Sequence, residues 1–167
     1  MEEEYNEMTG ATLNSIYDIW SDKSKGIIKQ SLSKPKKKLI WLDDCRDPFA
    51  EGATWIESYS PIGTNVDVIW LKSYDEFEYY IDEYGLPDAI CFDHDLGDES
   101  SDEKNGYDCA ALLVDYCMDY ELDIPKFAIQ SSNPSGAENI RSFLHSYHNH
   151  YVIEHNSILN PEYKNKK

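Results

Sequence analysis

The stretch Asp88-Ala-Ile-Cys-Phe-Asp93-His-Asp95-Leu-Gly97-Asp98 joins a short apolar run to a cluster of acids. The apolar run, residues 89–92, is too short for a helix, and the breakers Gly85 and Pro87 precede it. Short apolar runs bounded in this way are typical of buried strands. In an open parallel α/β sheet, ligands bind beyond the carboxyl ends of the strands. The acids after residue 92 are therefore predicted to lie at a binding edge.

The chain repeats this pattern once, in Lys38-Leu-Ile-Trp-Leu-Asp43-Asp44. Clustered carboxylates repel one another unless they share a cation or a proton. Hard divalent cations such as Mg²⁺ prefer oxygen ligands, and Mn²⁺ accepts the same donors. Asp43, Asp44 and Asp93 are therefore the predicted metal ligands. The alternative is that each Asp caps the loop or helix that follows it, which is a common role for a single Asp.

The rest of the chain alternates strand and helix patterns. Strands are predicted at 39–42, 66–71, 89–92, 127–130 and 151–154, with helices at 73–84, at 106–120 and after 135. Such alternation predicts a parallel sheet with helices on both faces. Because crossovers are right-handed, the expected fold is a three-layer, doubly wound, five-stranded α/β sheet of flavodoxin-like type. The irregular segment 45–65 would pass the acidic edge as a lid or ligand contact.

Three segments are predicted. Residues 1–37 form an appendage, with one short amphipathic helix around residues 13–20 and a Lys-rich linker, and it offers a surface for a protein partner. Residues 38–156 form the α/β domain. Residues 157–167 form a polar tail.

The formal net charge is −17. A surface for extended duplex nucleic acid would be basic, so that class of partner is not expected. A phosphorylated small molecule or an RNA end is still compatible, because a bound metal reverses the local charge.

The chain shows no run long enough to cross a membrane, and its acidic N-terminus is unlike a signal peptide. Its four cysteines form no CxxC pair, which favours reduced thiols and a cytoplasmic, intracellular location. The abundance of Tyr, Asn and Lys is compatible with an AT-rich, viral or phage-encoded source.

The predicted carboxyl edge gathers further polar side chains. Asp95 follows the third strand, and Ser131, Ser132 and Asn133 follow the fourth. A helix opening at Gly136 would point backbone N–H groups at the same edge, an arrangement that suits an anion. The alternative for this segment is ordinary helix capping, with Ser135 as the cap.

Three blocks in this order resemble a known family. They are Leu-Asp-Asp-Cys-Arg-Asp-Pro at 42–48, Phe-Asp-His-Asp-Leu-Gly at 92–97 and Asn-Pro-Ser-Gly-Ala-Glu-Asn-Ile-Arg at 133–141. Together they resemble the cyclic-phosphate-processing receiver domains, over roughly residues 38–155. The resemblance implies a receiver-like fold and an activity on cyclic phosphates, including those at RNA ends.

The leading hypothesis is a metal-dependent phosphoesterase that acts on cyclic nucleotides or on 2′,3′-cyclic phosphate RNA ends. In it, a metal held by the acids would activate water. The residues assigned to catalysis are Asp93, His94 and Asp95. Those assigned to the substrate are Arg46, Gln130, Ser131, Asn133 and Gly136.

One position departs from the family pattern, which places a His-Ser pair before the Asn-Pro block. Here the pair is Gln130-Ser131. A glutamine can orient water but cannot shuttle a proton. His94, beside the acids, is the candidate replacement.

Other functions are open at this point. The chain would instead be a non-catalytic receiver-like module that binds a nucleotide or a protein partner. In a signalling receiver, Asp93 would accept the phosphoryl group. Signalling receivers resemble one another in carrying a lysine after their fifth strand, whereas this chain has Glu154-His155-Asn156 there. Asp93-x-Asp95 also has the spacing of the two catalytic aspartates in the haloacid-dehalogenase phosphatases. In those enzymes a threonine follows the motif, whereas Leu96-Gly97 follows it here.

Overall fold

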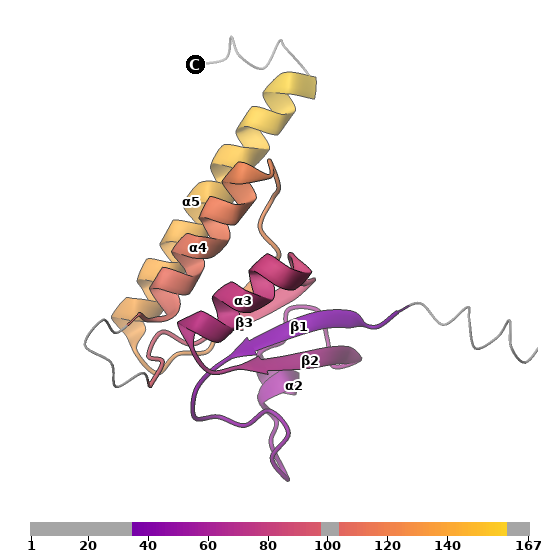
Figure 1. Ribbon diagram of the computed structural model, residues 1–167, viewed down its shortest axis with the longest axis vertical. Helices are drawn as coiled ribbons and strands as arrows, with labels where there is room; N and C mark the ends of the chain where they lie inside the picture. The colour runs from indigo at the N-terminus through magenta and orange to yellow at the C-terminus, as the bar shows by residue number, and fades with distance from the viewer. Residues whose placement is uncertain (1–34, 98–103, 160–167) are drawn as a thin grey trace, which may run out of the picture. The chain divides into compact units, whose positions relative to one another are not determined.

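Four parallel strands form the sheet of the computed structural model, which describes residues 35–97 and 104–159, with side chains to residue 155 (Figure 1). The strand order is β2-β1-β3-β4. The strands are β1 (Lys37–Leu42), β2 (Val66–Leu71), β3 (Ala89–Phe92) and β4 (Lys126–Ile129).

Strands β1, β2 and β3 end at the same level. Leu42, the last residue of β1, pairs with Leu71 of β2 and with Phe92 of β3. The next backbone amides continue the ladder, because Asp43 N–H donates to Leu71 O and Asp93 N–H donates to Leu42 O, each at 2.9 Å. The register alone therefore brings Asp43 and Asp93 to one edge of the sheet.

The two faces of the sheet are covered unequally. Successive strand residues point to opposite faces. Ile40 and Leu42 belong to the larger core, which α3 (Tyr74–Tyr84), α4 (Gly106–Asp119) and α5 (Pro134–Leu159) cover. Leu39 and Trp41 face a smaller core that the short helix α2 (Trp55–Tyr59) and its flanking loops cover. Figure 1 shows these three layers, with α4 and α5 packed side by side.

The predicted three-layer, doubly wound α/β class is confirmed, but the predicted fifth strand is wrong. Residues 151–154 lie within α5, which continues to Leu159. Their short apolar run resembles a strand, yet no Gly or Pro interrupts the chain between residues 137 and 159. Aromatic contacts at helical spacing join Tyr147 to Tyr151 and Tyr151 to His155, with ring centroids 6.3 and 5.5 Å apart. The helix therefore extends through the region and the sheet ends at β4.

Polar side chains fix where the helices begin. Ser73 caps α3 by accepting from Glu76 N–H at 3.2 Å, as its sequence predicts. Asn105 caps α4 in a capping box. The cap of α5 is Asn133 and not Ser135, which the sequence predicts. Asn133 Oδ1 accepts a hydrogen bond from Gly136 N–H at 2.9 Å. Pro134 then takes the first helical position, which requires no N–H donor.

The proposed appendage helix and most of the polar tail lie outside the described residues. No helix in the described ranges is long and apolar enough to cross a membrane. Cys91, Cys109 and Cys117 are buried free thiols, as expected, whereas Cys45 is exposed. Burial raises the pKa of Cys91 and of Cys117 to about 12, so these thiols stay protonated.

Candidate functional site

The acidic edge lies where the chain changes direction across the sheet. From β1 the chain moves outward to β2, and then crosses back to β3 on the other side of β1. Loops that follow β1 and β3 diverge at such a switch point, which leaves a crevice for ligands. Asp43 and Asp44 follow β1, and Asp93 follows β3, so the three acids line this crevice.

The three carboxylates meet closely enough to share one cation. One oxygen from each of Asp43, Asp44 and Asp93 lies within 4.8 Å of the others. Asp43 is completely buried and Asp93 is 7% exposed. The prediction that acids fifty residues apart in the sequence meet at one point is confirmed.

Backbone amides hold the two buried carboxylates in place. Asp43 Oδ1 accepts from the N–H groups of Cys45 at 3.0 Å and Arg46 at 2.6 Å. Asp93 Oδ1 accepts from the N–H of His94 at 2.7 Å. Each aspartate therefore caps the turn that follows its own strand, so the capping role and a metal-binding role are compatible.

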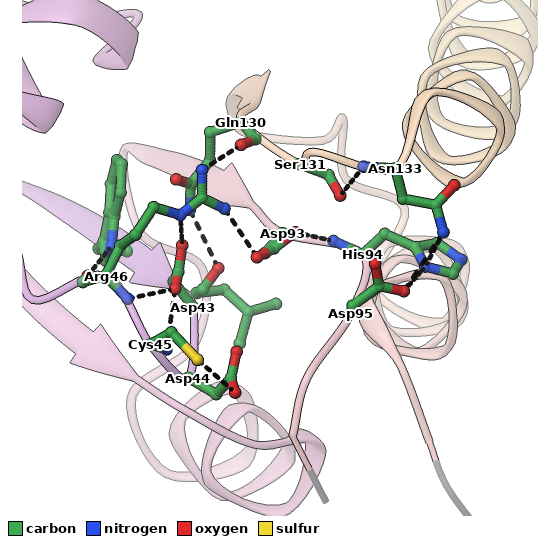
Figure 2. A network of polar contacts seen from close by, with 12 residues as sticks. Asp43, Asp44, Cys45, Arg46, Asp93, His94, Asp95, Gln130, Ser131 and Asn133 are labelled. Carbon is green, nitrogen blue, oxygen red and sulfur yellow. Dashed lines mark hydrogen bonds and ion pairs between the residues drawn. The ribbon is translucent and has the colours of Figure 1, made fainter.

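Arg46 links the two strand ends electrostatically (Figure 2). Its Nε lies 2.6 Å from Asp43 Oδ2, and its Nη2 lies 2.7 Å from Asp93 Oδ2. Its Nη1 donates to the backbone oxygen of Gln130 at 2.5 Å. All three guanidinium nitrogens of Arg46 therefore have partners, in the two acids and in the backbone that follows β4. The main role of Arg46 is to neutralise the buried negative charge.

These groups line a pocket of about 310 Å³. Its walls also include Asp95, Leu96, Gly97 and Ser132. The three clustered aspartates and Arg46 together leave two negative charges uncompensated. A divalent cation matches that charge, and carboxylate oxygens are the donors that Mg²⁺ or Mn²⁺ prefers. The donor set therefore fits a divalent metal, whose identity the geometry does not select.

Asp44 is the most accessible of the three acids, and its surroundings are tight. Its Oδ2 accepts a hydrogen bond from Cys45 Sγ at 3.0 Å. That hydrogen bond and the negative charge of Asp44 raise the pKa of the Cys45 thiol. A Cβ atom added at Gly97 would collide with the same Asp44 carboxylate. Gly97 and Cys45 thus position Asp44, a role that only the folded arrangement reveals.

His94 and Asp95 form a second polar group beside the acids (Figure 2). His94 Nδ1 lies 2.8 Å from Asp95 Oδ1, and Asn133 Nδ2 donates to the same oxygen at 3.3 Å. The hydrogen bond from His94, supported by Asn133, lowers the pKa of Asp95. An ionised Asp95 only accepts hydrogen bonds, so His94 Nδ1 carries the proton. The 3.4 Å approach of Asn133 Nδ2 to Nδ1 is therefore a contact between two donors.

The predicted substrate ligands occupy different places. Gly136 N–H is engaged by the Asn133 cap, and its missing side chain makes room for the imidazole of His94. Ser131 Oγ accepts from Asn133 N–H at 3.1 Å. Gln130 is 3% exposed and donates from Nε2 to Leu42 O at 3.2 Å. Its Oε1 is a buried acceptor without a partner in the described part of the chain.

The sequence of this edge matches a family model. The model describes a cyclic-phosphate processing receiver domain, and it matches residues 38–146. The chain belongs to this family. The match to the cyclic-phosphate processing receiver family spans the acidic edge and runs from within β1 to within α5.

Comparisons with individual proteins add little to the family assignment. No curated protein matches the chain. One solved structure, titled as a trimeric coiled coil of yeast Spc42 fused to another structure, is 18% identical with a TM-score of 0.45. The match covers 64% of this chain and 60% of that chain. Such a likeness is too slight to bear on function.

Proposed function

We propose that this receiver-like domain is a divalent-metal-dependent phosphoesterase that opens cyclic phosphates, in cyclic nucleotides or at 2′,3′-cyclic phosphate RNA ends. The observation that carries the proposal is the triplet Asp43, Asp44 and Asp93, which lines a pocket in a member of a family associated with cyclic-phosphate processing.

The three aspartates would hold Mg²⁺ or Mn²⁺, and the metal would polarise the phosphoryl group and lower the pKa of bound water. Arg46 compensates part of the carboxylate charge and therefore reduces the repulsion of an anionic substrate. The backbone hydrogen bonds to Asp43 and Asp93 fix the donor oxygens before a ligand arrives.

Asp95 is the proposed proton acceptor, because its carboxylate lines the acidic pocket. His94 Nδ1 lies 2.8 Å from Asp95 Oδ1, and together with Asn133 it holds that carboxylate in place. In the proposed step, water oxygen attacks phosphorus while a proton passes to the Asp95 carboxylate. The P–O bond to one ribose oxygen breaks, and that oxygen takes up the proton to give a phosphomonoester. This dyad supplies the proton transfer that Gln130 cannot supply.

The proposal is tested by turnover. The protein is incubated with 2′,3′-cyclic nucleotides and with an RNA ending in a 2′,3′-cyclic phosphate, in Mg²⁺, in Mn²⁺ and in EDTA. Phosphomonoester is followed by ³¹P NMR. We expect product with a metal and none in EDTA, with loss of activity in Asp44→Asn and retention in the control Asp47→Asn, whose parent carboxylate bonds only Phe49 N–H among the described residues. No product with either metal and either substrate would contradict the proposal.

A second candidate function is a non-catalytic module that binds a nucleotide or a protein partner. The buried Gln130 in the place of the family histidine favours it, because that side chain points at Leu42 O and not into the pocket. Cyclic-nucleotide binding without product in the same samples would select this function.

A further inference from the structure

A second pocket lies on the other side of His94. Its volume is about 590 Å³, and its lining residues are His94, Asn105, Tyr107, Asn139, Ser142 and Phe143. His94 lines this pocket, whereas its hydrogen-bonded partner Asp95 lines the acidic one. The His94–Asp95 pair therefore has one member in each pocket, and we name the second one the α4–α5 pocket.

Aromatic rings form one wall of the α4–α5 pocket. Tyr107, in the first turn of α4, packs against Phe143 of α5 with ring centroids 5.3 Å apart and planes tilted by 43°. Tyr107 is 37% exposed, so part of its ring is open to a ligand. Phe143 supports the ring from behind within the larger core. An exposed, supported aromatic ring is the kind of surface on which proteins stack nucleobases.

Among the described residues, the polar groups that line the α4–α5 pocket are the His94 ring, two side-chain amides and two hydroxyls, with no carboxylate. Asn139 is exposed on α5, six residues after the cap Asn133, and its side chain has no hydrogen-bond partner among the described residues. An asparagine amide offers both a donor and an acceptor to the edge of a base. In a chain with a net charge of −17, a pocket whose described lining holds no carboxylate is suited to a neutral, planar group.

We propose that the α4–α5 pocket receives the base of a nucleoside whose cyclic phosphate lies in the acidic pocket. This inference rests on the proposed function and deepens it, because it assigns the place where the base of the nucleoside substrate binds. In a nucleotide the ribose joins the phosphate to the base, so the two groups occupy neighbouring subsites. The pocket volume falls in the range of roughly 300–1,000 Å³ that is common for ligand sites.

The test compares two ligands in binding, not in turnover. The dissociation constants of 2′,3′-cyclic AMP and of the base-free ester glycerol 1,2-cyclic phosphate are measured by calorimetry in Mg²⁺. The proteins are the native chain, Tyr107→Leu, Asn139→Ala and the control Tyr79→Leu, whose parent side chain is exposed on α3. Leucine keeps apolar packing against Phe143 but removes the stacking face.

We expect the native chain to bind the nucleotide at least about tenfold more tightly than the base-free ester, since stacking of a base on an aromatic ring strengthens binding. Tyr107→Leu should remove most of that preference and Asn139→Ala part of it, while Tyr79→Leu retains it. Binding of the base-free ester should be the same in all four proteins, which also shows that the variants are folded.

Three results would overturn the α4–α5 subsite: equal affinities for the two ligands, a preference that survives in Tyr107→Leu, or no measurable nucleotide binding. Phosphomonoester measured in the same samples separates this inference from the proposed function. Base-dependent binding without product supports the subsite and contradicts the phosphoesterase. Product from both ligands without discrimination supports the phosphoesterase and contradicts the subsite.

Discussion

The imidazole of His94 lies so close to Gly136 that even a Cβ atom on this glycine would overlap the ring. His94 follows β3, and Gly136 lies in the first turn of α5. The contact therefore fixes the position of the His94–Asp95 pair relative to a helix that begins forty residues further along the chain.

Gly136→Ala should displace His94. Alanine in a helix is normally more stable than glycine by roughly 0.5–1 kcal/mol. Here we expect the opposite sign, a loss of about 1–2 kcal/mol in the free energy of unfolding, because the added methyl group overpacks a filled space. Urea unfolding measures the loss. Ser146→Ala, on an exposed face of the same helix, is the control and should leave stability unchanged. Equal or greater stability in Gly136→Ala would contradict the contact.

Arg46→Met should destabilise the protein at pH 7 in EDTA. Asp43 has no exposed surface and would lose its counter-ion. We expect a loss of about 2–3 kcal/mol, less than the roughly 3–5 kcal/mol for a fully buried pair, since the Arg46 side chain is 24% exposed. Mg²⁺ should raise the melting temperature more in this variant than in the native chain, because it replaces the missing positive charge. A metal-independent melting temperature would argue against a shared cation site.

Asp44→Asn should weaken metal binding by at least about tenfold, a loss of roughly 1.4 kcal/mol, because it removes one charged donor from the triplet. Calorimetric titration with Mn²⁺ measures the affinity. Asp95→Asn is the matched control, since Asp95 lines the same pocket but lies outside the triplet. If both variants lose metal equally, the ligand assignment is wrong.

His94→Gln should raise the pKa of Asp95 toward its ordinary value of 3.8, because the hydrogen bond from His94 is the main cause that lowers it. Carboxyl-carbon NMR titration follows the residue directly. A lowered folded-state pKa contributes stability that is present above the unfolded-state pKa and is lost as the pH falls through the folded value. The contribution is therefore fully present above about pH 4 and is lost as the pH falls below that value. Ser131→Ala, which leaves that hydrogen bond in place, should not shift the titration.

Cys45 should be the one thiol among the four that reacts with a thiol reagent in the folded protein, because the other three are buried. Its reaction at neutral pH should be slow, since Asp44 raises the pKa of the Cys45 thiol. Asp44→Asn should therefore speed the reaction severalfold, as followed by absorbance. Cys45→Ser should abolish it. Reaction of two or more thiols without denaturant would contradict the described burial.

The sequence predicts most of this fold because local patterns and tertiary position agree. Four strands, the α3 cap at Ser73 and the meeting of acids from β1 and β3 all follow from residue types and parallel topology. Residues 151–154 were predicted wrongly because a four-residue apolar run fits both a strand and one turn of a longer helix. The lack of Gly or Pro between residues 137 and 159 and the packing of Tyr147 against the larger core favour the helix.

The site was less predictable than the fold. Arg46 could be placed near the acids, but its simultaneous contacts with Asp43, Asp93 and the Gln130 carbonyl depend on three strand ends meeting. Gly97 and Gly136 leave the space that the side chains of Asp44 and His94 occupy. The sequence does not reveal these roles, because the contacts join segments that approach each other only in the folded chain. The wall formed by Tyr107 and Phe143 has the same origin, since it joins two helices.

Oδ1 of Asp43 and Oδ1 of Asp93 each accept hydrogen bonds from amide groups of the residues that follow them, while the Arg46 side chain contacts Oδ2 of both. The orientation of the two carboxylates is therefore set largely by the main chain of the two turns and completed by one arginine. A protein engineer who wished to graft this acidic centre onto another parallel scaffold would have to transplant both turns as intact backbone units.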